Sequence, residues 1–140
     1  MPDVTGTWDL VSATTTRRGE EARPYGPSPK GILVYGADGA VTVVIVSGDL
    51  GAFRSESIAT ASQSEAAHAF RRVLAYFGAY EVQDGTVVHR IEGSTFPNWT
   101  GRKQTRTIDV VGDHLTMSTP PIPAAAGEET TFTLVWQRRA

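Results

Sequence analysis

A two-residue alternation of side chains runs through most of this chain and constrains its fold more than any other feature. Side chains of a β-strand point alternately to the two faces of a sheet, so this period predicts strands. Eight runs are predicted as strands, at residues 6–16, 31–35, 40–47, 79–83, 86–95, 102–111, 114–119 and 130–138. Several are joined by short turn sequences such as Asp84-Gly85 and Gly112-Asp113, which favour antiparallel hairpins.

One segment has a helical period instead. Ser62 precedes Glu65 by three residues, which is the spacing of a capping box at a helix N-terminus. Apolar residues then recur along one helical face, at Phe70, Val73, Leu74 and Phe77. Gly78 is a natural stop, so we predict one helix of about 14 residues between the third and fourth strands. Its apolar stripe is expected to pack on the core, or to line a pocket if the helix covers an open barrel end.

Eight consecutive strands with short turns favour an all-β fold, an up-and-down antiparallel barrel, because closure removes the exposed edges of the sheet. The 140 residues match the size of one domain, and no repeat or linker divides them, so residues 1–140 are expected to form a single domain. No targeting segment is recognised, and the longest apolar run, residues 43–46, is too short for a membrane helix. We therefore expect a cytoplasmic protein that does not bind membranes.

Composition excludes several classes of function. With 13 Lys and Arg against 15 Asp and Glu, the net charge of −2 argues against nucleic acid or an anionic membrane as a partner. The chain has no cysteine, which excludes disulfides and cysteine-based chemistry. The histidines, His68, His89 and His114, are predicted on a helix, an inward face and an outward face, so no metal site is expected. Phosphate, dinucleotide and nucleophile-elbow motifs are absent, and we expect no cofactor.

A set of motifs resembles one known family. The first strand begins with Gly6-Thr7-Trp8, the Gly-x-Trp pattern of lipocalins, and the last contains Trp136-Gln137-Arg138. The family pattern is also matched at residues 6–12, 24–26, 29–35, 76–80, 89, 96–101, 104–106 and 115–116. Together they resemble the bacterial and fungal lipocalin-like domain proteins over nearly the whole chain. Arg90 departs from the pattern, since a second histidine often follows the first in this family.

The resemblance implies a small barrel with a pocket for an apolar organic molecule. Many members of the family belong to secondary-metabolite pathways, and some related barrels are cofactor-free cyclases or isomerases. The resemblance also implies that an arginine of the last strand lies over Trp8 and closes the barrel base. Arg138 has the inward parity for this contact, and Arg139 is the outward alternative.

Strand parity predicts which side chains face the interior. On residues 86–95 the apolar face carries His89, and on residues 102–111 it carries Gln104 and Arg106. With Tyr80, these polar residues are expected to converge on one cavity and to act as catalytic groups. The expected ligand-contacting residues are Tyr35, Phe77, Trp99, Met117, Phe132 and Leu134.

Each polar group also has a structural interpretation. His89, Tyr80 and Gln104 fit equally as core residues whose hydrogen bonds are satisfied internally or by water. Arg106 needs a partner, because an unpaired buried charge is costly. The acids of the neighbouring strands point outward by parity, namely Asp9, Glu81, Glu92 and Asp109. Its partner is then water at the mouth, a loop acid such as Glu20 or Glu21, or a ligand oxyanion.

Two functions fit this pocket. The leading hypothesis is a cofactor-free cyclase or isomerase for a polyketide-like or terpenoid-like substrate, with His89 moving a proton and Arg106 and Gln104 stabilising an oxyanion. The alternative is a carrier that only binds such a small apolar molecule. A scaffold or dimerisation module with a filled barrel is a third possibility, and a homodimer is left open.

Overall fold

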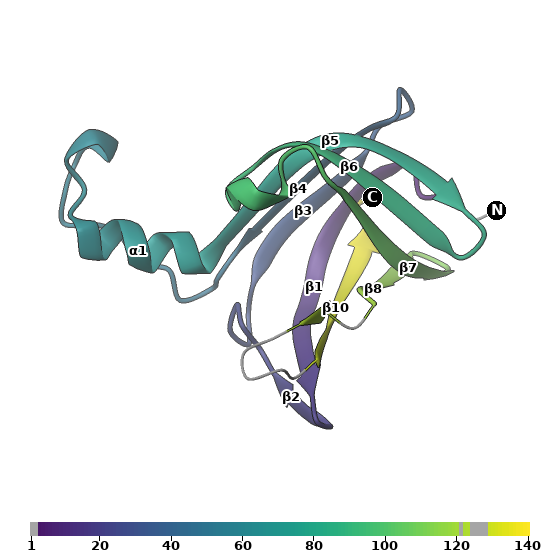
Figure 1. The fold of residues 1–140 in the computed structure, drawn as a ribbon, viewed down its shortest axis with the longest axis horizontal. Helices are drawn as coiled ribbons and strands as arrows, with labels where there is room; N and C mark the ends of the chain where they lie inside the picture. Colours follow the sequence, from purple (N-terminus) through teal and green to yellow (C-terminus); the bar gives the residue numbers. More distant parts are fainter. Residues whose placement is uncertain (1–2, 121, 124–128) are drawn as a thin grey trace.

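A computed structural model gives the fold and describes residues 3–120, 122–123 and 129–140 (Figure 1). Its strands are β1 Gly6–Arg17, β2 Glu20–Ala22, β3 Lys30–Tyr35, β4 Ala40–Val46, β5 Val73–Gln83, β6 Thr86–Ser94, β7 Lys103–Val111, β8 His114–Ser118, β9 Ile122–Pro123 and β10 Glu129–Arg138. The helices are α1 Gln63–Arg72 and two short 3-10 turns, η1 Ile58–Thr60 and η2 Pro97–Trp99. Between the strands predicted at residues 114–119 and 130–138, the structure contains the short strand β9, while residues 121 and 124–128 lie outside the described part.

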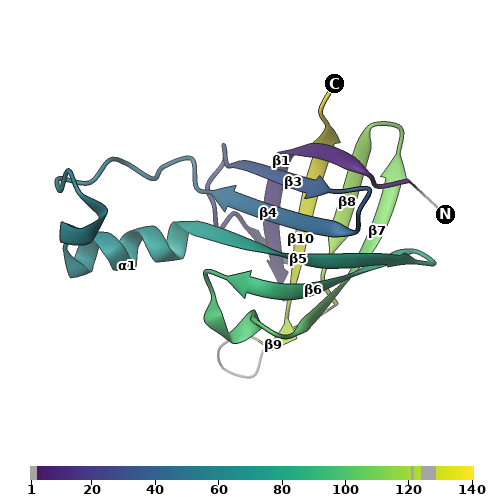
Figure 2. The same ribbon diagram turned by 90° about the horizontal axis from the view of Figure 1, so that it is seen from above.

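The strands form one antiparallel sheet that closes on itself. Its order is β2-β1-β3-β4-β5-β6-β7-β8-β10-β9, and β1 also pairs with β10 (Figures 1 and 2). The short strand β2 pairs with the end of β1, and the short strand β9 pairs with the start of β10. The eight long strands therefore make the predicted up-and-down antiparallel barrel, which is confirmed. The helix α1 lies between β4 and β5, the third and fourth strands of the barrel.

The helix starts as predicted but ends earlier. The hydroxyl of Ser62 accepts the backbone N–H of Glu65 at 3.1 Å, and the Glu65 carboxylate accepts that of Ser62 at 3.0 Å. The prediction that Val73, Leu74 and Phe77 continue the helix is wrong, because all three belong to β5. Residues 73–79 pair one by one with β4, and this ladder overrides a local helical period.

Gly78 lies in β5 opposite a bulge of β6 and is not the helix stop that the sequence suggests. The register between β5 and β6 shifts between Phe77 and Gly78. A Cβ atom at Gly78 would lie 1.8 Å from the carbonyl oxygen of Arg90, so only glycine fits this close backbone approach. Glycine marks helix ends and strand bulges alike, which is why the sequence signal is ambiguous.

The inward faces of the strands form an apolar core, as parity predicts. Its fully buried side chains include Trp8, Leu33, Val41, Ile45, Val87, Leu115 and Trp136. At the barrel base, the guanidinium carbon of Arg138 lies 4.2 Å from the Trp8 ring centroid, which confirms the predicted contact. Arg139 points outward and pairs with Asp9.

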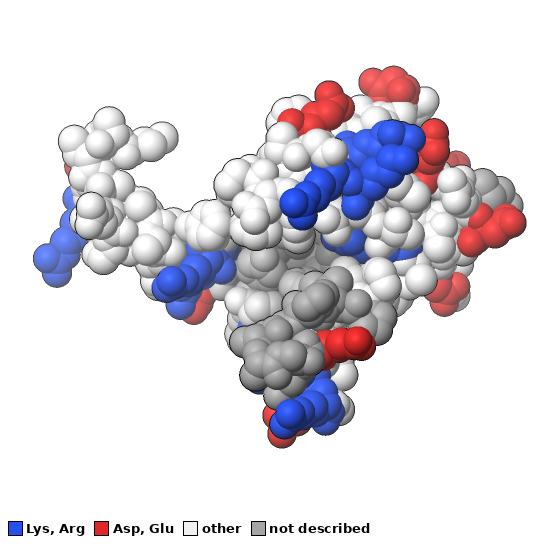
Figure 3. All heavy atoms as spheres, in the orientation of Figure 1, with Lys and Arg blue, Asp and Glu red and all other residues white. Residues whose placement is uncertain are grey.

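At the opposite end, α1 extends away from the barrel (Figures 1 and 2), and none of its residues is buried. Basic and acidic side chains are intermixed over the barrel face seen in Figure 3. No helix in the described part of the chain is long and apolar enough to cross a membrane.

Candidate ligand-binding site

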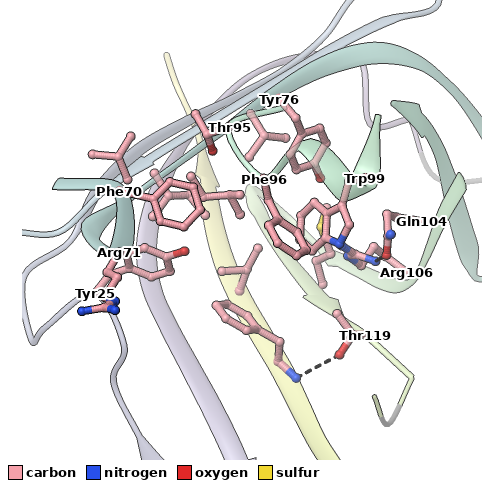
Figure 4. A pocket seen from close by; sticks show the side chains of 17 residues that line it. Tyr25, Phe70, Arg71, Tyr76, Thr95, Phe96, Trp99, Gln104, Arg106 and Thr119 are labelled. Atoms are coloured by element: carbon pink, nitrogen blue, oxygen red, sulfur yellow. Dashed lines mark hydrogen bonds between the residues drawn. The ribbon is translucent and has the colours of Figure 1, made fainter. Parts of the chain in front are cut away.

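A cavity of about 320 Å³ lies inside the barrel at the end from which α1 leaves (Figure 4). This volume is at the lower end of the range of roughly 300–1,000 Å³ for small-molecule pockets. Strands β4, β5, β7, β8 and β10 supply most of the wall. Its apolar and aromatic lining consists of Tyr25, Val43, Ile45, Phe70, Val73, Leu74, Tyr76, Phe96, Trp99, Met117, Phe132 and Leu134.

Aromatic side chains surround the part of the cavity near the helix. Phe70, at the end of α1, is 52% exposed yet also borders the cavity. Trp99 of η2 stands edge-on to both Phe96 and Tyr76, with ring centroids 5.7 and 5.9 Å apart. The loop after β6 thus holds Trp99 against the cavity, where the sequence analysis expected it.

Arg106 and Gln104 bring the polar character to one side of this cavity, and both lie where parity predicted them. The Arg106 side chain is 7% exposed, and its Nη1 donates to Gln104 Oε1 and to the backbone oxygen of Thr105, both at 3.2 Å. No carboxylate of the described residues pairs with Arg106. The expected loop acids, Glu20 and Glu21, lie exposed on β2 instead. The positive charge of Arg106 therefore faces a largely apolar cavity, with no counter-charge from the residues that the structure describes.

His89 lies behind Tyr76 and does not line the cavity. It is fully buried, and its two ring nitrogens bond different tyrosines. Nε2 is 2.6 Å from the Tyr35 hydroxyl, and Nδ1 is 2.7 Å from the Tyr76 hydroxyl. Burial, and then the charge of Arg106, lowers the pKa of His89 to about 3. The imidazole is consequently neutral near pH 7, and its geometry matches the structural interpretation of this residue.

Three other candidates lie outside the cavity wall. The Tyr80 hydroxyl donates to the backbone oxygen of Gly36 at 2.8 Å, and its ring packs on that of Tyr35. Tyr35 is a core residue that reaches His89. Phe77 is 55% exposed on the outer face, because the pleat of β5 turns its neighbours Tyr76 and Gly78 inward. By contrast, Met117, Phe132 and Leu134 do line the cavity.

Tyr76 is a polar site residue that sequence reasoning missed. It sits in the segment predicted as helix, off the apolar stripe. Extending the strand pattern backward from Tyr80 would have placed Tyr76 on the same inward face, four residues earlier. Burial raises the pKa of its hydroxyl to about 12, while the charge of Arg106 acts in the opposite direction. The hydroxyl therefore stays protonated and can donate.

The closed eight-stranded barrel with an internal apolar cavity places this protein among the small β-barrels with room for one ligand. The family model of the lipocalin-like domain matches residues 5–139, and the chain belongs to that family. One curated relative, the 4'-hydroxy-3'-methoxypropiophenone carrier protein ppsC of Aspergillus oryzae, is 34% identical over 85 residues, which cover 55% of this chain and 77% of the relative. No solved structure matches the chain significantly.

Proposed function

We propose that this protein binds and carries one small aromatic or otherwise apolar molecule that bears an oxygen function, in secondary metabolism. The observation that carries the proposal is the cavity, whose wall is apolar except for Arg106, Gln104, Arg71 at the helix end and a few hydroxyl groups. Such a wall with few convergent polar groups is the usual form of a small-molecule site. The name of the relative, a carrier of a phenolic ketone, supports both the ligand class and the carrier role.

The placement of His89 favours a carrier over a cyclase or isomerase. A general base must reach its substrate within about 3 Å and works best with a pKa near the operating pH. Both nitrogens of His89 are engaged by tyrosines, and its pKa of about 3 makes it a weak base. No His, Asp or Glu of the described residues lines the cavity. Catalysis would have to rest on Arg106, Gln104 and Tyr76 acting on a substrate oxygen without a base.

Calorimetric titration with 4'-hydroxy-3'-methoxypropiophenone tests the proposal. Leu134→Trp fills the cavity and is expected to weaken binding at least tenfold, which is about 1.4 kcal/mol. Gln137→Trp places the same side chain on the outer face of β10 and should bind like wild type. Chromatography of the bound compound should recover it unchanged.

The outcomes are distinct. Absence of binding, or equal binding by both variants, contradicts an internal carrier site. Steady conversion of the compound by wild type that is lost in Leu134→Trp supports the cyclase or isomerase hypothesis instead.

A further inference from the structure

A chain of hydrogen bonds connects the barrel core to the cavity through Tyr35, His89 and Tyr76. The Tyr35 hydroxyl lies 2.6 Å from His89 Nε2, and the Tyr76 hydroxyl lies 2.7 Å from Nδ1. A neutral imidazole has one nitrogen that donates and one that accepts. One tyrosine must therefore donate to the ring, and the other must accept from it.

The burial of Tyr35 decides which tyrosine donates. Its side chain is 1% exposed, and His89 is the one hydrogen-bond partner of its hydroxyl within the described part of the chain. If Nε2 carried the proton, the Tyr35 O–H would be a buried donor without an acceptor, which is unfavourable. Tyr35 therefore donates to Nε2, and Nδ1–H donates to Tyr76. The proton of Tyr76 is left to point elsewhere.

The cavity is where the Tyr76 proton can go. Tyr76 lines it, and Figure 4 shows its hydroxyl turned toward the side where Trp99, Gln104 and Arg106 lie. The Nδ1–H of His89 already donates to the Tyr76 oxygen, and the positive charge of Arg106 acts on the same hydroxyl. A ligand oxygen that carries no proton can therefore accept the Tyr76 proton, and the charge of Arg106 favours such an anionic oxygen.

The neighbouring polar groups are donors as well. Gln104 Oε1 already accepts from Arg106, so its amide N–H groups remain free for the cavity. Nη1 of Arg106 is committed to two acceptors, while its other nitrogens still carry N–H groups. Because Nη1 is engaged twice, an end-on pair of bonds from Nη1 and Nη2 to a carboxylate is disfavoured, and Nε and Nη2 are the nitrogens left to donate to a ligand. One guanidinium charge and three donor groups thus surround a position suited to a single anionic oxygen.

We infer that the polar side of the cavity is an oxyanion site that binds a phenol or enol in its deprotonated form, with Tyr76, Arg106 and Gln104 as donors. His89 and Tyr35 are positioning residues that turn the Tyr76 hydroxyl toward this oxygen. The inference rests on the proposed function and deepens it, since it states the ligand class and its ionisation state.

The test measures the pKa of a bound phenol. The probe is 4'-hydroxy-3'-methoxypropiophenone, whose phenolate absorbs at longer wavelength than the phenol. We expect binding to wild type to lower the pKa of the phenol by at least one unit. The phenolate then binds at least tenfold more tightly than the neutral phenol. The methyl ether of the probe cannot ionise, and its binding should show no such pH dependence.

Variants identify the donors. Arg106→Gln and Tyr76→Phe should each remove most of the shift, while both still bind the methyl ether. Lys103→Gln removes a positive charge from the outer face of the same strand and should leave the shift unchanged. Nitrogen-15 NMR of the free protein should find the His89 proton on Nδ1.

The outcomes separate the two proposals. If both compounds bind the cavity and the phenol pKa is unshifted or raised, the oxyanion site is wrong and the carrier function stands. If neither compound binds, both proposals fall. Tighter binding of 3,4-dimethoxybenzoate than of the phenolate would overturn the single-oxygen assignment. A wild-type His89 protonated on Nε2 would overturn the orientation of Tyr76.

Discussion

Two inward arginines of this barrel hold their charge in different ways. Arg138 lies over the Trp8 ring and donates to the backbone oxygens of Thr5 and Asp3, at 2.5 and 2.9 Å. Arg106 has one backbone acceptor and the Gln104 side chain, and otherwise faces the cavity. The first arrangement satisfies the guanidinium within the protein, and the second leaves it available to a ligand.

Replacing Arg138 should weaken the barrel base. Arg138→Met keeps much of the apolar stem but loses the cation–π contact and two hydrogen bonds, which together amount to about 2–4 kcal/mol. Urea denaturation of wild type and variant measures the loss. Arg139→Met, which removes an exposed ion pair with Asp9, is the matched control and should change stability far less. Equal effects of the two changes would contradict the role given to Arg138.

His89 should make the stability of the protein depend on pH. Its pKa is about 3 in the fold and near 6.5 when unfolded, chiefly because burial disfavours the charged ring. The unfolded chain then takes up a proton below pH 6.5 that the folded chain refuses, so stability falls as pH falls. Between pH 7 and pH 5, wild type should lose about 2 kcal/mol more than His89→Gln. Denaturation curves at both pH values measure this, and parallel losses would contradict it.

At the scale of elements, β5 is the strand that shapes the site. It takes over directly from α1 at Val73 and pairs with both β4 and β6. At Gly78, opposite the bulge of β6, its backbone comes close to β6, and its pleat turns Tyr76 inward and Phe77 outward. The position of the cavity residues therefore depends on this one strand and on the bulge that faces it.

Gly78→Ala should be strongly destabilising. The added methyl group would overlap the backbone of Arg90, and such overpacking costs about 1–3 kcal/mol or more. Gly51→Ala is the control, because nothing lies within 4 Å of a Cβ atom there. Thermal unfolding of the two variants should differ clearly. A Gly78→Ala protein as stable as Gly51→Ala would show that the bulge can rearrange.

The helix α1 is stabilised locally and contributes little to the core. Ser62→Ala removes the N-cap, which is worth about 0.5–2 kcal/mol to the helix. Because no residue of α1 is buried, we expect faster hydrogen exchange of the α1 amides with little change in the melting temperature. A large drop in melting temperature would mean that α1 is coupled to the barrel more tightly than its exposure indicates.

For the whole molecule, closure of the barrel is what creates the cavity. Strand β1 pairs with β3 on one side and β10 on the other, so the sheet has no long free edge among the described residues. Buried side chains fill the barrel at its base. At the opposite end the barrel encloses a cavity of about 320 Å³. A ligand that binds there binds the folded protein and not the unfolded chain, which has no cavity.

Ligand binding should therefore stabilise the entire barrel. At a ligand concentration one hundred times Kd, the free energy of unfolding should rise by about 2.7 kcal/mol. Thermal melts of wild type with 4'-hydroxy-3'-methoxypropiophenone measure the gain, and Leu134→Trp should show little of it. A comparable gain in that variant would place the ligand outside the cavity.

The sequence alone determined the barrel and the facing of its residues. The two-residue period is a property of each strand by itself, so the inward positions of Trp8, His89, Gln104, Arg106 and Arg138 could be read locally. The start of α1 could be read for the same reason, because a capping box is a contact between residues three apart.

Only the tertiary structure decided where the helix ends and which inward residues meet the cavity. Residues 73–79 become strand because β4 pairs with them, a contact that no local period reveals. Parity states that His89 points inward but not how deep it lies. Depth depends on the register of neighbouring strands, and that register places Tyr76 between His89 and the cavity. Pairing between distant segments sets these positions, because the free energy of a sheet lies in contacts between strands and not within them.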